Sequence, residues 1–268
     1  MFSAQRQAEI LRIVRAKQTC TISELADTFS VSDETIRRNI GPLIAEGLLT
    51  KVHGGVMQPD RDRIDEAPFQ RRMLDNQLAK RAIAACVAEL VEDGDSLMLD
   101  GGSTCVHIAE ALRTHARLTV VTNSTEIGRM LAPCNDNRVF MAGGALRPDD
   151  SSAVDESALA FIRQFHVRYA IASVTAVDAQ GRFMDSLPAD AALSLAMFAQ
   201  AEQRVVVADQ TKFGHSALVH AFGPEGVDVL ITDKTPTPSL VQIFAAAGLE
   251  VRYPVTNAAR PGRSAATI

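Results

Sequence analysis

The stretch from Thr21 to Met57 constrains the fold of this chain most, because helix-start and turn signals follow one another there at short spacing. Thr21 and Glu24 have the spacing of a capping box, which predicts a helix over residues 22–29. A short turn follows, and Ser32 at its end is a favourable cap for another helix. Two helices joined by a turn are therefore expected here.

The second of these helices has an apolar face and a basic face. Three apolar residues recur at helical spacing and are expected to pack inward: Ile36, Ile40 and Leu43. At about 100° per residue, Arg38 falls on the opposite face and Arg37 on the flank. Residues 48–52 and 56–57, with a Gly-Gly turn between them, predict a β-wing. This pattern alone is also compatible with an ordinary three-helix subdomain that exposes two arginines.

The residues themselves resemble a known family. SxxTIRR followed by EGLLxKVHGG resembles the winged helix-turn-helix of the DeoR family of bacterial transcriptional regulators, and QRQAEILRIVRAK resembles that family's first helix. The resemblance implies that the partner is double-stranded operator DNA. Arg38 is expected to contact base edges, and Arg37 and Lys51 to contact phosphates. The candidate DNA-binding residues are Ser32, Glu34, Thr35, Arg37, Arg38, Lys51 and His53.

Two positions depart from the family pattern. Asn39 stands where the family usually has Asp, and its place near the apolar face predicts a packing or capping role. Proline lacks the helical N–H and disfavours helical geometry in the residue before it. A kink or break in the helix is therefore expected near Gly41, with Pro42 restarting it as its first residue.

Composition limits the classes of protein that fit. The net charge of −5 is uneven, because residues 1–58 carry +1 and the remainder −6. This distribution suits a small DNA-reading module on an acidic body and does not suit a nonspecific polyanion binder. No apolar run is long enough to span a membrane, no signal peptide is evident, and the four cysteines form no CxxC pair. We expect a cytoplasmic protein with no membrane association, no metal and no cofactor.

The chain is expected to divide into a DNA-binding domain at 1–58, a linker and bridging-helix start at 59–75, a sensor domain at 76–254 and a disordered tail at 255–268. One helix is predicted over residues 68–91. Its basic residues are interpreted as a solvated face: Arg71, Arg72, Lys80 and Arg81.

From Gly94 onward, apolar runs alternate with helical stretches, which predicts a mostly parallel α/β sheet covered on both faces. The predicted strands are 96–99, 118–122, 138–141, 169–174, 204–208, 227–232 and 250–253. The predicted helices are 103–113, 124–131, 156–164, 188–201 and 238–247.

Polar and glycine-rich loops follow several of these strands. In open α/β sheets, ligands bind beyond the carboxyl ends of the strands, and a helix N-terminus there favours an anion. Lys212 would supply a compact cation for a phosphate. The candidate effector-binding residues are Gly101, Gly102, Ser103, Thr104, Asn123, Gly143, Gly144, Asp178, Asp190 and Lys212.

The same loops carry a second resemblance. GGST, VTNS, AGGALR, VDAQG, ADQTKFG and ITD, in this order, resemble the DeoR-type sensor domain, which is related in fold to ribose-5-phosphate isomerase, glucosamine-6-phosphate deaminase and CoA-transferase-like proteins. The resemblance implies that a phosphorylated sugar or sugar catabolite is sensed, and FIRQF and TKFGHSALV are most similar to glycerol-3-phosphate repressors. Ser173-Val174-Thr175-Ala176 and the pair Asp190 and Ser194 depart from the family pattern.

The leading hypothesis is a regulator, with repression expected, of carbohydrate catabolism genes, which leaves DNA when a phosphorylated effector binds. A homodimer or tetramer is expected, because one near-neutral reading module has little charge for tight binding. Two alternatives remain open. One is a sugar-phosphate isomerase or deaminase using Asp178, Asp190 or Asp209 as a base, although no catalytic residues are assigned. The other is a structural DNA protein without a ligand.

Overall fold

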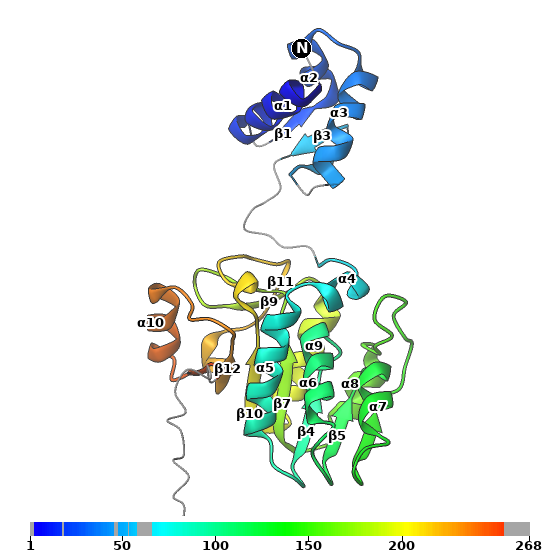
Figure 1. Cartoon of the computed structure of the whole chain (residues 1–268), viewed down its shortest axis with the longest axis vertical. Coiled ribbons are helices and arrows are strands. Elements are labelled where there is room, and N and C mark those ends of the chain that lie inside the picture. Colours follow the sequence, from blue (N-terminus) through cyan, green and yellow to red (C-terminus); the bar gives the residue numbers. More distant parts are fainter. Residues whose placement is uncertain (1–2, 18, 46–47, 53, 58–65, 255–268) are drawn as a thin grey trace, which may run out of the picture. The chain divides into compact units, whose positions relative to one another are not determined.

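The computed structural model shows a chain that divides into two compact units, residues 1–63 and 64–268 (Figure 1). It describes residues 3–17, 19–45, 48–52, 54–57 and 66–254. The boundary between the units falls inside the predicted linker. His53 and the predicted tail lie outside the described residues. None of the described helices is long and apolar enough to cross a membrane.

The first unit packs three helices against a small antiparallel sheet. The helices are α1 (Ser3–Lys17), α2 (Ile22–Phe29) and α3 (Asp33–Ala45). The strands are β1 (Thr19–Thr21), β2 (Thr50–Val52) and β3 (Gly55–Met57), in the order β1-β3-β2. Buried apolar residues from all three helices and the sheet form one core, and they include Ile10, Leu25, Ile36, Leu43 and Val56. This arrangement is the predicted winged helix-turn-helix.

Local hydrogen bonds explain the start of α2. Gly55 explains why β1, a strand that the sequence does not predict, can form. The Glu24 N–H donates to Thr21 Oγ1 at 3.1 Å and the Thr21 N–H donates to Glu24 Oε2 at 2.8 Å, which confirms the capping box. β1 becomes a strand only by pairing with β3, far along the chain. Gly55 permits that pairing, because a Cβ there would collide with the carbonyl oxygen of Cys20.

Of the predicted kink or break near Gly41, the break and the restart of the helix at Pro42 are wrong. α3 runs without interruption from Asp33–Ala45 and contains Pro42. The clash that disfavours a helical residue before proline involves that residue's N–H and its Cβ, and glycine removes the second of these. Gly41 and Pro42 are both exposed, while Ile40 and Leu43 on either side are buried in the same core. Packing of Ile40 and Leu43 into one core therefore favours a continuous helix across Gly41 and Pro42.

The second unit is built on a seven-stranded parallel sheet, which confirms the predicted α/β fold. Its strand order is β13-β12-β10-β7-β4-β5-β6. The bounds are β4 (Ser96–Leu99), β5 (Thr119–Thr122), β6 (Arg138–Met141), β7 (Val167–Ser173), β10 (Ala201–Val207), β12 (Val229–Ile231) and β13 (Glu250–Arg252).

Helices cover both faces of this sheet, as the near-continuous apolar strands require (Figure 1). One face packs against α5 (Gln77–Leu90), α6 (Ser103–Leu112) and α7 (Thr125–Leu131). The other packs against α8 (Glu156–Ile162), α9 (Pro188–Phe198) and α10 (Pro238–Ala246). Successive residues of β4 separate accordingly, with Leu97 and Leu99 in the first core and Met98 in the second.

Two helix predictions need correction. The single helix expected over residues 68–91 is two helices, α4 (Phe69–Leu74) and α5, because Asp75 is extended and Asn76 is left-handed with φ 55°. Asparagine tolerates this conformation better than most residues. α9 ends at Phe198 instead of residue 201, because Ala201 already belongs to β10, where it pairs with β7.

A second small sheet was not predicted by the sequence pattern. β8 (Ala176–Val177), β9 (Phe183–Asp185) and β11 (Val219–Phe222) pair in the order β11-β9-β8, all antiparallel. These strands are only two to four residues long, so they show no clear alternation. Short 3-10 helices follow β10 at Gln210–Lys212 and precede β12 at Pro224–Gly226.

Candidate functional site

The outer face of α3 and the wing form the candidate nucleic-acid interface. Arg37, Arg38 and Lys51 are exposed, and Arg37 and Arg38 make no ion pair with any described residue. A groove of about 250 Å³ runs between α3 and the wing. Arg37 and Lys51 line it, together with the backbone of Gly41 and Gly54. The rest of its lining is largely apolar, with Ile40 and Ile44 of α3 among it, so its two cations are the groups suited to contact a phosphate backbone.

The residues around these cations fix the helix start and its inner side. Ser32 Oγ accepts the Thr35 N–H at 3.3 Å and lies 3.0 Å from Thr35 Oγ1, so Ser32 caps α3. Glu34 is exposed on the first turn. Asn39 is buried and its Nδ2 donates to the Thr35 carbonyl at 2.7 Å. The expectation that Asn39 has a packing or capping role is thus confirmed.

The candidate effector site lies beside β4, where the strands that follow in the chain stop adding to one side of the sheet and begin adding to the other. β4 continues to β5 and β6 on one side, and the chain then returns to β7 on the other side of β4. The loops after β4 and β7 therefore diverge and leave a crevice at the carboxyl ends. Asp100 follows β4, and its Oδ2 accepts the Ser173 hydroxyl at 3.0 Å across this point.

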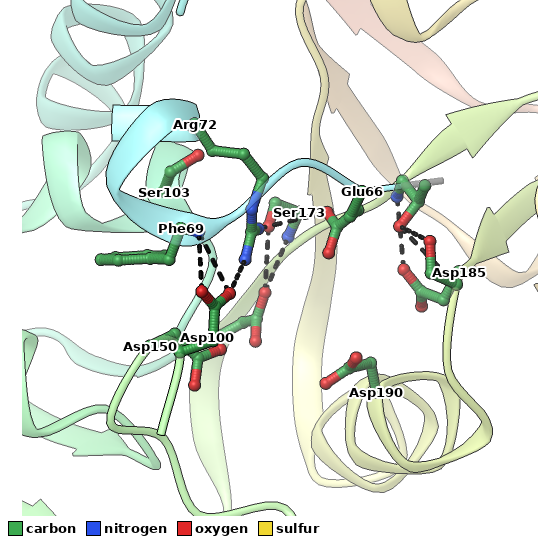
Figure 2. Close-up of polar contacts among 12 residues, drawn as sticks. Glu66, Phe69, Arg72, Asp100, Ser103, Asp150, Ser173, Asp185 and Asp190 are labelled. Atoms are coloured by element: carbon green, nitrogen blue, oxygen red, sulfur yellow. Dashed lines mark hydrogen bonds and ion pairs between the residues drawn. The ribbon is translucent and has the colours of Figure 1, made fainter. Parts of the chain in front are cut away.

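A segment that precedes the sheet closes the crevice (Figure 2). The Phe69 N–H donates to both carboxylate oxygens of Asp149 at 3.1 Å. Arg72 Nη1 lies 3.2 Å from Glu66 Oε1 and Nη2 lies 3.6 Å from Asp149 Oδ2. The guanidinium also lies over the Phe69 ring, 5.4 Å from its centroid. We call residues 66–74 the roof segment; its ion pairs and hydrogen bonds fix it to the loop after β6.

Beneath the roof segment is a cavity of about 170 Å³, which we call the lysine compartment. Lys80 is 4% exposed, and its Nζ donates to Ser103 Oγ at 3.0 Å and to the Arg72 carbonyl. Lys212 lines the same cavity from the loop after β10. The pKa of Lys80 is lowered to about 8, mainly by burial; Asp209 opposes this shift, and the nearby Lys212 and Arg72 contribute to it. Neither lysine forms an ion pair with a described residue.

Next to it is a smaller cavity of about 30 Å³, which we call the acidic compartment. Its lining shares Glu66 and Arg72 with the lysine compartment and includes five carboxylates: Glu66, Asp100, Asp150, Asp185 and Asp190. Arg147 bridges two of them, with Nη1 at 2.8 Å from Asp190 Oδ1 and Nη2 bonded to Asp150. Burial and, to a smaller extent, the nearby Asp190 carboxylate together raise the pKa of Asp100 to about 6.

Five of the ten predicted effector residues line these compartments or contact their lining. Gly102 and Asp190 line the acidic compartment, and Ser103 and Lys212 line the lysine compartment. A Cβ at Gly102 would collide with the Ser173 hydroxyl, so glycine is needed for the close approach of β4 and β7. Gly101 is buried, and its backbone N–H donates to the carboxylate of Asp100, which lines the acidic compartment.

The other five predicted residues lie elsewhere among the described residues. Thr104 and Asn123 are buried, and Asn123 Nδ2 donates to the Ala153 carbonyl at 3.1 Å. Gly143 and Gly144 are exposed in the loop after β6. Asp178 lies in the β8–β9 turn, where its Oδ2 accepts Arg182 Nε at 2.6 Å. These residues line neither compartment.

Several lining residues were missed, and one interpretation was wrong. Lys80 was assigned to a solvated helix face, yet it is buried, and the Arg72 side chain is only 14% exposed. A signal was present, because Lys80 shares helical spacing with the buried Ile83, Ala84 and Val87. Asp185 had no comparable signal, since it reaches the site through the unpredicted β9.

The fold and these sites define a DNA-binding transcriptional regulator with a separate sensor domain. Residues 6–62 match the family model described as a DeoR-like helix-turn-helix domain, and residues 75–234 match the model of the DeoR C terminal sensor domain. The chain belongs to the DeoR family.

Relatives align with this chain over most of their length. The chain is 31% identical to the glycerol-3-phosphate regulon repressor of Escherichia coli (strain K12), covering 91% of this chain and 96% of that protein. It is 32% identical to the transcriptional repressor AccR of Agrobacterium fabrum (strain C58 / ATCC 33970), covering 85% and 88%. Among solved structures, ribose 5-phosphate isomerase A from Methanocaldococcus jannaschii is similar with a TM-score of 0.38 and 18% identity, over 52% of this chain and 55% of that chain.

Proposed function

We propose that this protein is a repressor that leaves its operator when a phosphorylated carbohydrate, or a phosphorylated catabolite of one, binds the sensor domain. Two relatives are named as repressors, and one of them is named for glycerol 3-phosphate. The observation that carries the proposal is the pair Lys80 and Lys212, which lie with Ser103 in one cavity at the start of α6 and have no described ion-pair partner.

The phosphate would be held by charge and by the helix start together. α6 begins at Ser103, and the backbone N–H groups of its first turn have no hydrogen-bond acceptor within the helix. A helix N-terminus favours an anion, and two ammonium groups add to that potential. An anion between the lysines would also raise the depressed pKa of Lys80, so it would be bound most tightly while Lys80 is protonated.

The hydroxyl groups of the ligand would have an acceptor in the same compartment. Asp209 Oδ1 accepts the Thr211 N–H at 2.9 Å and the Thr211 hydroxyl at 2.5 Å. Asp209 Oδ2 is buried and has no hydrogen-bond partner among the described residues. A buried carboxylate oxygen without a donor is costly, and a ligand hydroxyl would supply the donor.

The DNA contacts are proposed on the exposed face of α3 and the wing. Arg38 would contact base edges, whereas Arg37 and Lys51 would contact phosphates. The other proposed contacts are Ser32, Glu34, Thr35 and His53. An effector releases the operator only if it binds the two states of the protein with different affinity. The roof segment supports such coupling, because it begins the sensor unit just after the DNA-binding unit and closes the effector cavity.

A homodimer or tetramer is proposed for the DNA-bound form, because two reading modules double the contacts and match repeated half-sites. Leu74 and Leu78 on α4 and α5 are 72% and 84% exposed, which suits a contact between copies of the chain. Light scattering at micromolar concentration is expected to give a mass of at least two chains. A monomer that still binds the operator tightly would contradict this.

A thermal-shift screen of the full chain with sugar phosphates tests the function most broadly. A ligand at about 100 times its dissociation constant should stabilise the protein by roughly 2.7 kcal/mol. Each phosphate ester is compared with its neutral parent sugar. We expect at least one ester to shift the transition while its parent does not. If an ester and its parent sugar shifted the thermal transition equally, the proposed anion site would be refuted.

A further inference from the structure

The acidic compartment contains more carboxylates than its cations can balance. Five carboxylates and two arginines line it among the described residues. Both arginines are already paired: Arg147 with Asp150 and Asp190, and Arg72 with Glu66. Asp100 and Asp185 therefore have no cationic partner in the part of the chain that the structure describes. Figure 2 shows Glu66, Asp100, Asp185 and Asp190 reaching this space from separate segments of the chain.

Asp185 also has an oxygen with no hydrogen-bond donor. The residue is 4% exposed, and its Oδ1 accepts the Thr175 N–H at 3.3 Å. Its Oδ2 is buried and finds no donor among the described residues. Buried polar atoms are almost always satisfied, and an unsatisfied carboxylate oxygen is among the most costly. Because Asp185 lines the compartment, a donor from a bound ligand would complete its hydrogen bonding.

The size of the compartment limits what that donor can be. A volume of about 30 Å³ admits one or two groups the size of a water molecule, since one water needs roughly 10–15 Å³ by the same measure. An ammonium group is about that size, whereas a sugar ring is far larger. The adjoining lysine compartment, at about 170 Å³, shares Glu66 and Arg72 with it and has room for the rest of a ligand.

Charge distinguishes an ammonium from the other donors of this size. No group of three or more His, Cys, Asp or Glu among the described residues has an arrangement that could hold a metal ion. Burial and the nearby Asp100 and Asp190 carboxylates raise the pKa of Asp185 well above its usual value, so this environment favours its protonated form. A hydroxyl donor leaves that like-charge repulsion in place, whereas a cation at this place would favour the ionised carboxylates and bind them by charge.

We propose that the acidic compartment binds a protonated amine, and that the effector is a small phosphate ester whose other end carries this amine. The inference rests on the proposed function for the phosphate end and adds the chemistry of the opposite end. The ammonium donates to Asp185 Oδ2 and lies between the Asp185 and Asp100 carboxylates, while Lys80 and Lys212 hold the phosphate.

Isothermal titration of the full chain with matched ligand pairs tests the proposal. The probes are glucosamine 6-phosphate against glucose 6-phosphate, and phosphoethanolamine against ethylene glycol monophosphate. The unphosphorylated pair glucosamine and glucose and inorganic phosphate are measured alongside. In at least one phosphorylated pair, the amine is expected to bind about tenfold or more tightly than its hydroxyl twin, because it forms charge-assisted hydrogen bonds.

Asp185→Asn and Asp100→Asn, which preserve side-chain shape, locate the preference. Each is expected to reduce the amine preference at least threefold, and the double variant is expected to abolish it, while inorganic phosphate binds as in wild type. Asp178→Asn is the matched control, because Asp178 is a buried carboxylate outside both compartments. It should keep the full preference once its thermal transition confirms folding.

The outcomes separate this inference from the proposed function. Equal binding of the twins, tighter binding of the hydroxyl ligands, or a preference unchanged in the double variant would overturn the amine site and leave the phosphate site standing. Binding of glucosamine but not glucose, with no binding of any phosphate, would support the amine site and refute the phosphate sensor. Absence of binding by every probe would reject both.

Discussion

The DNA-reading surface and the effector cavity are assembled in different ways. Arg37 and Arg38 are adjacent on one helix, and Lys51 lies a short distance further along the chain. The effector cavity gathers residues from Glu66 to Lys212, which meet only because the sheet brings its strand ends together. Arg37 and Arg38 of the DNA-reading surface, which we call the reader, have no described ion-pair partner. Arg72 and Arg147 at the cavity are paired. The reader thus presents its charge outward to a partner, whereas at the cavity the arginines are paired internally and the lysines and two carboxylates are left for a ligand.

The largest expected effect tests whether the two units are stable independently. Ile36→Ala removes a fully buried side chain from the core of the first unit. A cavity of this kind costs about 2–5 kcal/mol. Operator binding should be lost, while the thermal shift caused by an effector in the sensor should remain. Leu218→Ala, at an exposed site, should leave both unchanged. Loss of effector binding in Ile36→Ala would show that the units are not independent.

The next effect tests the cavity without touching the reader. Lys212→Ala removes one of the two ammonium groups that line the lysine compartment. A charge-assisted bond contributes about 1.5–3 kcal/mol, so affinity for a phosphorylated effector should fall roughly ten- to a hundredfold. Operator affinity should not change. Lys234→Ala, at an exposed lysine after the neighbouring strand β12, is the control. Similar losses in both variants would mean that Lys212 has no specific role.

The complementary test alters the reader alone. Arg38→Ala should weaken operator binding by about 1–3 kcal/mol and affect random DNA much less, because a base contact is lost. Arg37→Ala should weaken binding to both DNAs by similar amounts, as loss of a phosphate contact does. Fluorescence anisotropy with labelled duplexes measures both. If Arg38→Ala reduced binding to both DNAs equally, its assignment to base edges would be wrong.

These two regions also differ in how far the sequence predicts them. The capping box at Thr21 and the apolar face of α3 depend on residues within one or two turns, so they were predicted correctly. The main sheet was predicted because each strand is a local apolar run. Asp185 and the partners of Arg72 could not be predicted, because their positions depend on strand order and on contacts across the unit. At Gly41, the local rule that a helix ends before a proline is overridden by core packing.

The smallest expected effect is a pH dependence confined to the cavity. The pKa of Lys80 is lowered to about 8 by burial, so its protonated form disappears as pH rises through this value. Affinity for a phosphate ester should fall above about pH 8, by at most roughly tenfold per pH unit for one linked proton. Stability without ligand should rise over the same interval and up to the unfolded pKa of about 10.4, because the unfolded chain keeps the Lys80 proton longer.

Calorimetry of wild type and Lys80→Met between pH 7 and 9 checks this sign. The variant should bind more weakly at pH 7 and show no fall in affinity above pH 8. Operator binding by the reader should not follow the titration of Lys80. A wild-type affinity that rises with pH would refute the role given to this lysine.

The central claim is that an anion in the cavity releases the reader from DNA. The direct measurement is anisotropy of a labelled operator bound to the full chain, titrated with a phosphate ester that binds in the thermal-shift screen and with its neutral parent. We expect the ester to release the operator, the parent to have no effect, and Lys212→Ala to require roughly ten- to a hundredfold more ester. Operator binding that stays unchanged at saturating ester would contradict the account.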